Sequence, residues 1–336
     1  MKHILYIGNK LEKHGATPTS IDTLPKLLSD EPFVFKTVSS AKIKALRLFH
    51  MLWATIKNSN RKDLVLIDTY STRNFWYAVL CGWLCRAFSV PYIFILHGGN
   101  LDAKFKNSSE RILQIFRDSR LNVVPSAFLK DKLVDFHFQH IKIIPNSIEL
   151  SRYNFKKRKE LIPKLLWVRA FHKVYNPEMA ILVLEKLLQI YPNAELCMVG
   201  PEKDGSLKKL EVLVERKKLP VIFKGKLAKR EWIELSKNYD IFLNTTSIDN
   251  TPVSVIEAMA LGLPVVSTNV GGIPYLISDG ENGILVGSNN ANQMFSEIDR
   301  LLKDPQLAET ISLYARKEAD KFDWNKVKYK WLELLG

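Results

Sequence analysis

The sequence predicts an α/β protein with two doubly wound domains, each built on a mostly parallel sheet. Two observations carry this prediction. Short apolar runs alternate with helical stretches along the chain, and gaps of roughly ten residues or more suit right-handed crossovers. A polar, basic segment then divides the pattern into two similar halves. With 336 residues, the chain is long enough for two domains of ordinary size.

Six apolar runs of the first half are expected to form one sheet. They read HILYIG, FVFKTV, LVLID, PYIFILH, LNVVP and IKIIP, ending at Gly8, Val38, Asp68, His97, Pro125 and Pro145. The start MKHILYIG is too short for a signal peptide and is expected to form a buried first strand. The most hydrophobic region, Phe75–Gly99, is interrupted by Arg86 and Pro91 before one helix could span a bilayer. We therefore expect a buried helix over 71–88, a turn and a strand there.

Six further runs predict the second sheet. They read KLLWV, ELCMVG, VIFKGK, IFLNTT, PVVST and GILVG and begin at Lys164, Glu195, Val221, Ile241, Pro264 and Gly283. We expect a first domain over 1–150, a linker over 151–163, a second domain over 164–320 and a terminal helix over 321–336. That helix has an apolar stripe, and packing it back on the first domain would bury the stripe.

Composition is that of a soluble globular protein, 46% hydrophobic and 25% charged. Three cysteines form neither a disulfide framework nor a metal-binding pair, which fits a reducing cytoplasm. The net charge is +14, and the stretch 41–62 holds six basic residues, no acidic one and interleaved apolar residues. That pattern suits an anionic surface at the inner face of the cytoplasmic membrane. A packed helix with a solvated basic face is the alternative, and no motif indicates nucleic-acid binding.

Ligands of open α/β sheets bind beyond the carboxyl ends of the strands, so polar residues there are the candidates for a site. Gly15 and Ala16 precede a helix that Thr17 or Thr19 could cap, and small residues let a phosphate approach the backbone. His97 ends a strand before Gly-Gly-Asn, where it could meet a substrate. The alternatives are an ordinary βα loop and a histidine bonded to its own loop.

Two cations, Arg169 and Lys173, follow the first strand of the second half. Asn176 and Pro177 then open a helix. Fixed cations beside a helix N-terminus suit a diphosphate, and a guanidinium can make paired contacts with it. A solvated basic loop is the alternative reading.

The stretch SIDNTPVSVIEAMALGLPVVST contains the richest pattern of the chain. Thr251 is expected to cap a helix whose first residue is Pro252, which leaves the amides of Val253 and Ser254 free for a phosphate. Asp249 precedes this helix. Glu257 lies in its second turn, where a carboxylate can accept two hydrogen bonds from a diol such as a ribose. An ordinary capped helix with two solvated carboxylates remains the alternative.

The same stretch resembles the signature of glycosyltransferase family 4. The match is Asp249-x7-Glu257, continued as EAMALGLPVVSTNVGGIPYLISDGENGILV, while HGGN, VPSAFLKDKL, IIPNSIEL and FDWNKVKYKWLELL occur in the expected order over nearly the whole chain. Members of that family are retaining enzymes with the GT-B fold. The resemblance therefore implies two Rossmann-like domains facing each other across a cleft.

Carried over by position, the resemblance assigns most of the candidate residues to a nucleotide-sugar donor. Glu257 would hold the ribose. Arg169 and Lys173 would neutralise the diphosphate, assisted by amides around Gly15 and Val253. The spacing of the two cations departs from the family, because four residues is closer than usual.

The remaining two residues would act at the reacting sugar. Asp249 would hold sugar hydroxyls, although the family usually has the longer Glu there, and His97 would line the reaction centre. The resemblance implies transfer from a UDP- or GDP-sugar, with retention, to a glycan or lipid-linked acceptor of surface polysaccharide or lipopolysaccharide synthesis. It implies no metal or other cofactor, and the chain has no Asp-x-Asp motif. A nucleotide-sugar epimerase and an inactive nucleotide-sugar-binding partner are the alternatives.

Overall fold

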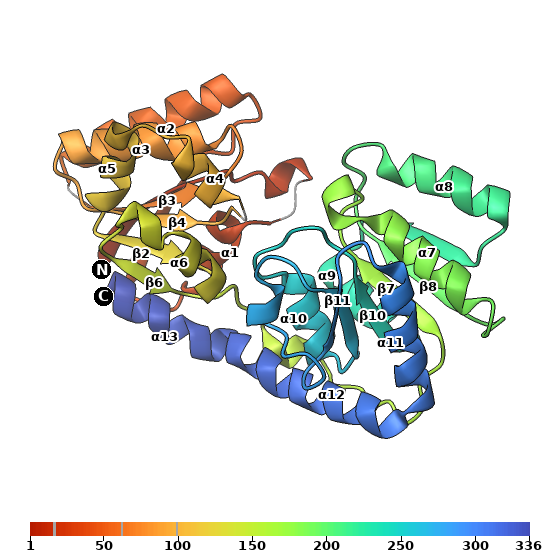
Figure 1. Cartoon of the computed structure of the whole chain (residues 1–336). Helices are drawn as coiled ribbons and strands as arrows, with labels where there is room; N and C mark the ends of the chain where they lie inside the picture. Colours follow the sequence, from red (N-terminus) through yellow and green to blue (C-terminus); the bar gives the residue numbers. More distant parts are fainter. Residues whose placement is uncertain (16–17, 62, 99) are drawn as a thin grey trace. The chain divides into compact units, whose positions relative to one another are not determined.

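The computed structural model describes residues 1–15, 18–61, 63–98 and 100–336 (Figure 1). The chain divides into two compact units. Unit 1 comprises Met1–Pro145 and Lys328–Gly336, and unit 2 comprises Asn146–Val327. The described residues do not include three that sequence analysis named: Ala16, the alternative cap Thr17, and Gly99, the second glycine of the HGGN motif.

Unit 1 is built on a six-stranded parallel sheet with the order β2-β1-β3-β4-β5-β6. Its strands are β1 (Lys2–Ile7), β2 (Phe33–Val38), β3 (Leu64–Thr69), β4 (Tyr92–Leu96), β5 (Leu121–Val124) and β6 (Ile141–Ile143). The central strands β3 and β4 are buried at every position, because helices cover both faces of a parallel sheet. All six predicted runs are confirmed as strands.

Helices connect these strands, and crossovers between parallel strands of one sheet are almost always right-handed. They are α1 (Ser20–Leu27), α2 (Lys44–Ser59), α3 (Phe75–Ala87), α4 (Leu101–Lys106), α5 (Glu110–Arg117) and α6 (Ala127–Lys132). The step from β1 to β2 runs across the sheet in the opposite direction to the later steps. When crossovers of the same hand run in opposite directions, their helices lie on opposite faces of the sheet. Accordingly, α1 lies on one face, and α2, α3 and α5 lie on the other (Figure 1).

Unit 2 repeats this design with the strand order β12-β11-β10-β7-β8-β9. The strands are β7 (Lys164–Val168), β8 (Glu195–Val199), β9 (Val221–Gly225), β10 (Ile241–Asn244), β11 (Val265–Thr268) and β12 (Ile284–Val286). The chain proceeds outward from β7 to β9, then returns to place β10 on the other side of β7. The carboxyl ends of β7 and β10 thus flank the switch point where such sheets bind ligands.

The helices of unit 2 include the predicted phosphate-binding helix, with one correction to its start. They are α7 (Pro177–Leu187), α8 (Ser206–Lys217), α9 (Lys229–Leu235), α10 (Val253–Ala260), α11 (Ala291–Lys303) and α12 (Pro305–Ala319). The prediction that Thr251 caps α10 is wrong. Pro252 is the N-cap, with an extended ψ of 116°, and its carbonyl accepts from the amides of Val255 and Ile256 at 3.1 and 3.3 Å.

The C-terminal helix α13 (Trp324–Leu335) returns to the first sheet, as expected from its apolar stripe. Its last residues belong to unit 1. There Lys328 pairs with Glu31 at 2.5 Å, Lys142 pairs with Glu333 at 2.8 Å, and Trp331 is buried. Among the described helices, none combines the length and hydropathy needed to cross a membrane.

The polar segment between the two predicted domains is fastened to unit 2 by a buried cation. Arg158 is 5% exposed, and its guanidinium donates to the carbonyls of Tyr239 and Gly262 at 3.0 and 2.8 Å. It also pairs with Asp240 at 3.2 Å. A basic residue of the predicted linker therefore holds that segment against the turns before β10 and after α10.

Candidate active site

Arg169 and Asp249 meet at the switch point of unit 2. Arg169 follows β7 and Asp249 lies in the loop after β10, and their side chains form an ion pair. The two side chains are only 14% and 15% exposed. The guanidinium also lies over the ring of Tyr175, 4.2 Å from its centroid. The structure thus brings together two predicted site residues that are 80 positions apart in the sequence.

The backbone around Arg169 holds its guanidinium in place. The Arg169 amide donates to the carbonyl of Val199 at 3.0 Å. Gly200 has φ +154°, and a Cβ there would lie 1.7 Å from the Arg169 carbonyl oxygen, so only glycine fits. Burial lowers the pKa of Arg169 from its ordinary value, with an opposing contribution from Tyr175. Its buried Nε has no acceptor among the described residues.

A Gly-Gly turn holds Asp249 from the other side. The Asp249 carbonyl accepts from the amide of Gly272 at 2.9 Å, and its Oδ1 accepts from the amide of Asn250 at 2.9 Å. Gly271 has φ +56°, and a Cβ there would approach the Asp249 carbonyl oxygen to 2.2 Å. Sequence analysis missed this support, although a Gly-Gly pair two residues after the strand PVVST was its signal.

The N-terminus of α10, which follows Asp249 closely in the sequence, offers hydrogen-bond donors. Within the part of the chain that the structure describes, the amides of Val253 and Ser254 have no backbone acceptor. The hydroxyl of Ser254 is buried and has no partner among the same residues. Thr251 is partly buried in the loop before them. Free amides at the positive end of a helix form a seat for a phosphate.

Glu257 is buried, 2% exposed, and is held by two residues that sequence analysis did not identify. Tyr153 donates its hydroxyl to Glu257 Oε1 at 2.6 Å, and Lys229 at the start of α9 pairs with the same oxygen. Burial raises the pKa of Tyr153, and the neighbouring Glu257 carboxylate raises it further. The second oxygen, Oε2, accepts no hydrogen bond from the described residues. One oxygen is therefore fixed and the other is free for a ligand hydroxyl.

Lys173 stands apart from this group. Its side chain is exposed, and no hydrogen bond or ion pair joins that side chain to another described residue. Its backbone amide donates to Asp204 at 2.8 Å. That bond and the Ser206 hydroxyl lower the pKa of Asp204 to about 2. The structure thus gives Lys173 no contact with Arg169 or Asp249 in the unliganded chain.

In unit 1, His97 belongs to a polar cluster built on a buried carboxylate. Asp68, at the end of β3, receives hydrogen bonds from His97 Nε2 and Tyr6 Oη, both at 2.9 Å, and from Tyr70 Oη at 3.0 Å. The Tyr70 ring also stacks on the imidazole. Burial, followed by the Asp68 charge, raises the pKa of both tyrosines. Sequence analysis missed this support, and the signal was the aspartate closing an apolar strand next to that of His97.

Gly8 makes room for this cluster. A Cβ at Gly8 would lie 2.4 Å from Asp68 Oδ2. We expect Gly8→Ala to displace Asp68 and to lower the free energy of unfolding by about 1–3 kcal/mol, as overpacking does. Urea denaturation measures it. Gly287→Ala is the matched control because its Cβ would meet only ordinary contacts beyond 3.4 Å, and an equal loss in both variants would contradict the argument.

The other predicted glycine, Gly15, ends a short 3-10 helix (Glu12–His14) with φ +79°. Its amide donates to the Glu12 carbonyl at 3.0 Å, and a Cβ built on it would meet nothing within 4 Å. It belongs to unit 1, like His97, whereas the predicted contacts to the donor at Arg169 and Glu257 belong to unit 2.

Two parallel α/β sheets, with a partly buried ion pair and a free helix N-terminus at the switch point of the second, define a glycosyltransferase of the GT-B type. Family comparisons agree over almost the whole chain. Residues 2–152 match Glycosyltransferase Family 4, and residues 152–318 match Glycosyl transferases group 1. The chain belongs to the group 1 glycosyltransferases.

Individual relatives and solved structures support this placement. The chain is 30% identical to sulfoquinovosyl transferase SQD2 of Arabidopsis thaliana over 46% of its length and 30% of that protein's. It is 25% identical to D-inositol 3-phosphate glycosyltransferase of Corynebacterium jeikeium over 75% of its length and 68% of that protein's. The crystal structure of Anabaena HepE in complex with UDP has a TM-score of 0.79 at 17% identity, covering 100% of this chain and 99% of HepE.

Proposed function

We propose that this protein transfers a sugar from a UDP- or GDP-sugar to a glycan or lipid-linked acceptor, with retention at the anomeric carbon and without a metal. The observation that carries the proposal is the partly buried Arg169–Asp249 pair at the carboxyl ends of β7 and β10. One partner suits a diphosphate and the other suits sugar hydroxyls. A nucleotide-sugar carries both groups, so binding it requires both side chains in one place.

Unit 2 supplies the groups proposed to bind the donor. Arg169 would contact the diphosphate through its guanidinium, and the amides of Val253 and Ser254 would contact it through the end of α10. Glu257 would accept ribose hydroxyls at Oε2. Lys173 has an exposed side chain and would reach the diphosphate only after the donor arrives. UDP is the first nucleotide to try, because the structurally similar HepE was crystallised with UDP and with UDP-glucose.

Electrostatic stabilisation of the leaving diphosphate would provide most of the catalysis. Negative charge develops on that group as the glycosidic bond breaks, and a fixed cation with oriented amides stabilises it without reorganisation. The departing phosphate would accept the proton of the acceptor hydroxyl. His97, held by Asp68, would contact the reacting sugar, and Asp249 would orient its hydroxyls. The pathway that fits is synthesis of a surface polysaccharide or lipopolysaccharide at the inner face of the cytoplasmic membrane.

Nucleotide binding and product configuration test this function together. We expect calorimetry to detect binding of UDP or GDP with the same affinity in EDTA and in magnesium. With an α-linked nucleotide-sugar and a glycan acceptor, proton NMR is expected to show an α-linked product. A β-linked product, binding only with magnesium, or conversion of the donor to its epimer without an acceptor would each contradict the proposal.

A further inference from the structure

Three tryptophans of unit 1 lie at the surface on two neighbouring helices. Trp53 of α2 is 59% exposed, and Trp76 and Trp83 of α3 are 50% and 55% exposed. The other four tryptophans of the chain are at most 9% exposed. Indole side chains are usually among the more buried, so three exposed rings on two packed helices indicate a surface that is covered in use.

The exposed apolar residues follow helical spacing, so each helix presents one stripe. On α2 the stripe consists of Leu46, Phe49, Trp53 and Ile56, which are spaced three or four positions apart. On α3 it consists of Trp76, Leu80 and Trp83. The opposite sides of both helices are buried. Because α2 and α3 pack together on one face of the sheet, their stripes form one surface (Figure 1). We define it as the tryptophan face: Leu46, Phe49, Trp53, Ile56, Trp76, Leu80 and Trp83.

The charges bordering the tryptophan face are basic. Neither α2 nor α3 contains an acidic residue. Lys42, Lys44 and Lys57 are exposed at the two ends of α2. Arg47 is different, because it is 4% exposed and donates to Asn9 Oδ1 at 2.8 Å and to the Ala41 carbonyl at 2.8 Å. Within the described part of the basic stretch, the lysines and Arg61 are thus exposed and Arg47 is structural, while Lys62 lies outside the described residues.

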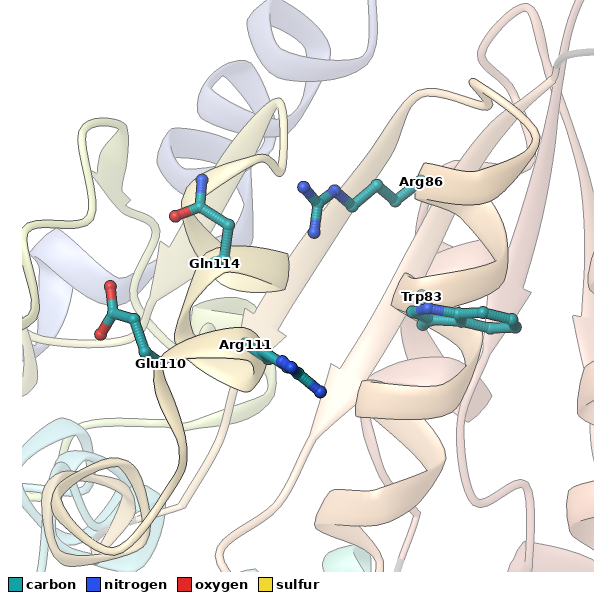
Figure 2. Close-up of a pocket in the computed structure, with 5 residues that line it drawn as sticks. All are labelled: Trp83, Arg86, Glu110, Arg111 and Gln114. Atoms are coloured by element: carbon teal, nitrogen blue, oxygen red, sulfur yellow. The ribbon is translucent and has the colours of Figure 1, made fainter.

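A pocket of about 380 Å³ lies between α3 and α5, beside this face. Figure 2 shows Arg86 of α3 and Arg111 of α5 extending into the space between the two helices, next to Trp83. Arg86 is paired with Asp118 at 2.7 Å. Arg111 forms no ion pair with another described residue. The pocket is also lined by Glu110, which pairs with Arg117, so Arg111 contributes a guanidinium without an ion-pair partner among the described residues at the edge of the tryptophan face.

We propose that the tryptophan face docks on a bilayer containing anionic phospholipid, with its tryptophan rings inserted at the headgroup level and Arg111 against a lipid phosphate. An apolar helix face bordered by cations is the pattern of an interfacial segment, and indole rings favour that depth. The inference gives a partner to the membrane location in the proposed function. It extends the membrane-binding surface from the basic stretch 41–62 to α3 and the pocket. It does not depend on sugar transfer.

The same charges argue against a second copy of this chain as the occupant. A twofold interface would bring the identical surface of two chains together. The lysines at the ends of α2 would then face one another with no acidic residue on either helix to compensate them. An anionic bilayer compensates all of them at once.

Quenching by lipid bromine atoms tests insertion directly. We expect the protein to co-sediment with vesicles of phosphatidylcholine and phosphatidylglycerol, and much less with phosphatidylcholine alone. Brominated acyl chains are expected to quench its tryptophan fluorescence. In the triple variant Trp53→Phe, Trp76→Phe, Trp83→Phe, the quenching should disappear while sedimentation persists, because the four remaining tryptophans are buried.

Two sets of variants separate the apolar and the charged contributions. Trp53→Gln with Trp83→Gln is expected to reduce vesicle binding at least tenfold, whereas Val134→Gln with Tyr329→Gln, at exposed sites elsewhere in unit 1, should not. Lys44→Glu with Arg111→Glu should remove the preference for phosphatidylglycerol. Circular dichroism checks the fold of each variant.

Three results would overturn the inference: sedimentation without bromine quenching, equal binding by the glutamine pair and its control, or concentration-dependent dimers in light scattering without lipid. Arg169→Ala should bind vesicles like the wild type. Failure of the vesicle test is therefore distinguishable from failure of the proposed sugar transfer.

Discussion

Arg169→Ala is expected to weaken binding of UDP or GDP by roughly one to two orders of magnitude, since a hydrogen bond to a charged group contributes about 1.5–3 kcal/mol. The guanidinium is partly buried and already oriented by its backbone and by Tyr175, so little entropy is lost when a diphosphate arrives. Arg169→Lys should be intermediate, because it keeps the charge but loses the planar set of donors.

Isothermal titration calorimetry with UDP and GDP measures this effect. Lys208→Ala is the control, since Lys208 is an exposed cation on α8 of the same unit. Its affinity should equal that of the wild type. If Arg169→Ala retained the wild-type affinity, the diphosphate would bind elsewhere and the site assignment would be wrong.

Asp249→Asn is expected to lower kcat on the order of 100-fold, the usual cost of losing one contact that strengthens in the transition state. Free UDP should bind no more weakly than in the wild type. It lacks the sugar, and the Asp249 carboxylate competes with the diphosphate for Arg169 in the empty site. Steady-state kinetics and calorimetry on one preparation separate the two effects, and weaker UDP binding would show that Asp249 supports the donor site rather than the sugar.

Comparing the two carboxylates sharpens this test. Glu257→Gln should mainly raise the donor KM and weaken UDP binding, because a ribose contact is equal in the ground and transition states. Asp249→Glu restores the side chain usual in the family. In a pocket shaped by the Gly271–Gly272 turn, the extra methylene should crowd the sugar and reduce activity. Higher activity in that variant would indicate that Asp249 is a degraded residue.

The strands could be predicted from the sequence because burial on both faces of a parallel sheet demands continuous apolar runs. Every predicted run is a strand. The start of α10 was less predictable. Proline at the first helical position and at the N-cap leaves the same pattern in the sequence, and only ψ at Pro252 distinguishes the two.

Contacts between distant side chains could not be predicted in the same way. The order of strands in the sheet decides which loops meet, and periodicity says nothing about that order. Asp249 follows β10, and only the placement of β10 beside β7 brings it to Arg169. The partners of Glu257 come from a polar segment and a helix start that carried no distinguishing pattern, namely Tyr153 and Lys229.

The division of α13 between the two units has a consequence for the order in which the protein matures on the ribosome. Residues 328–336 complete unit 1, yet they are synthesised after every residue of unit 2. The apolar surface that receives Trp331 and Leu335 stays uncovered through all of that time. Domains generally fold in the order in which they emerge. Here the first sheet can form early, but the helical turns that complete it arrive only after the second unit has been made. Nascent chains are therefore exposed to chaperones and proteases at that surface until residues 328–336 have been synthesised.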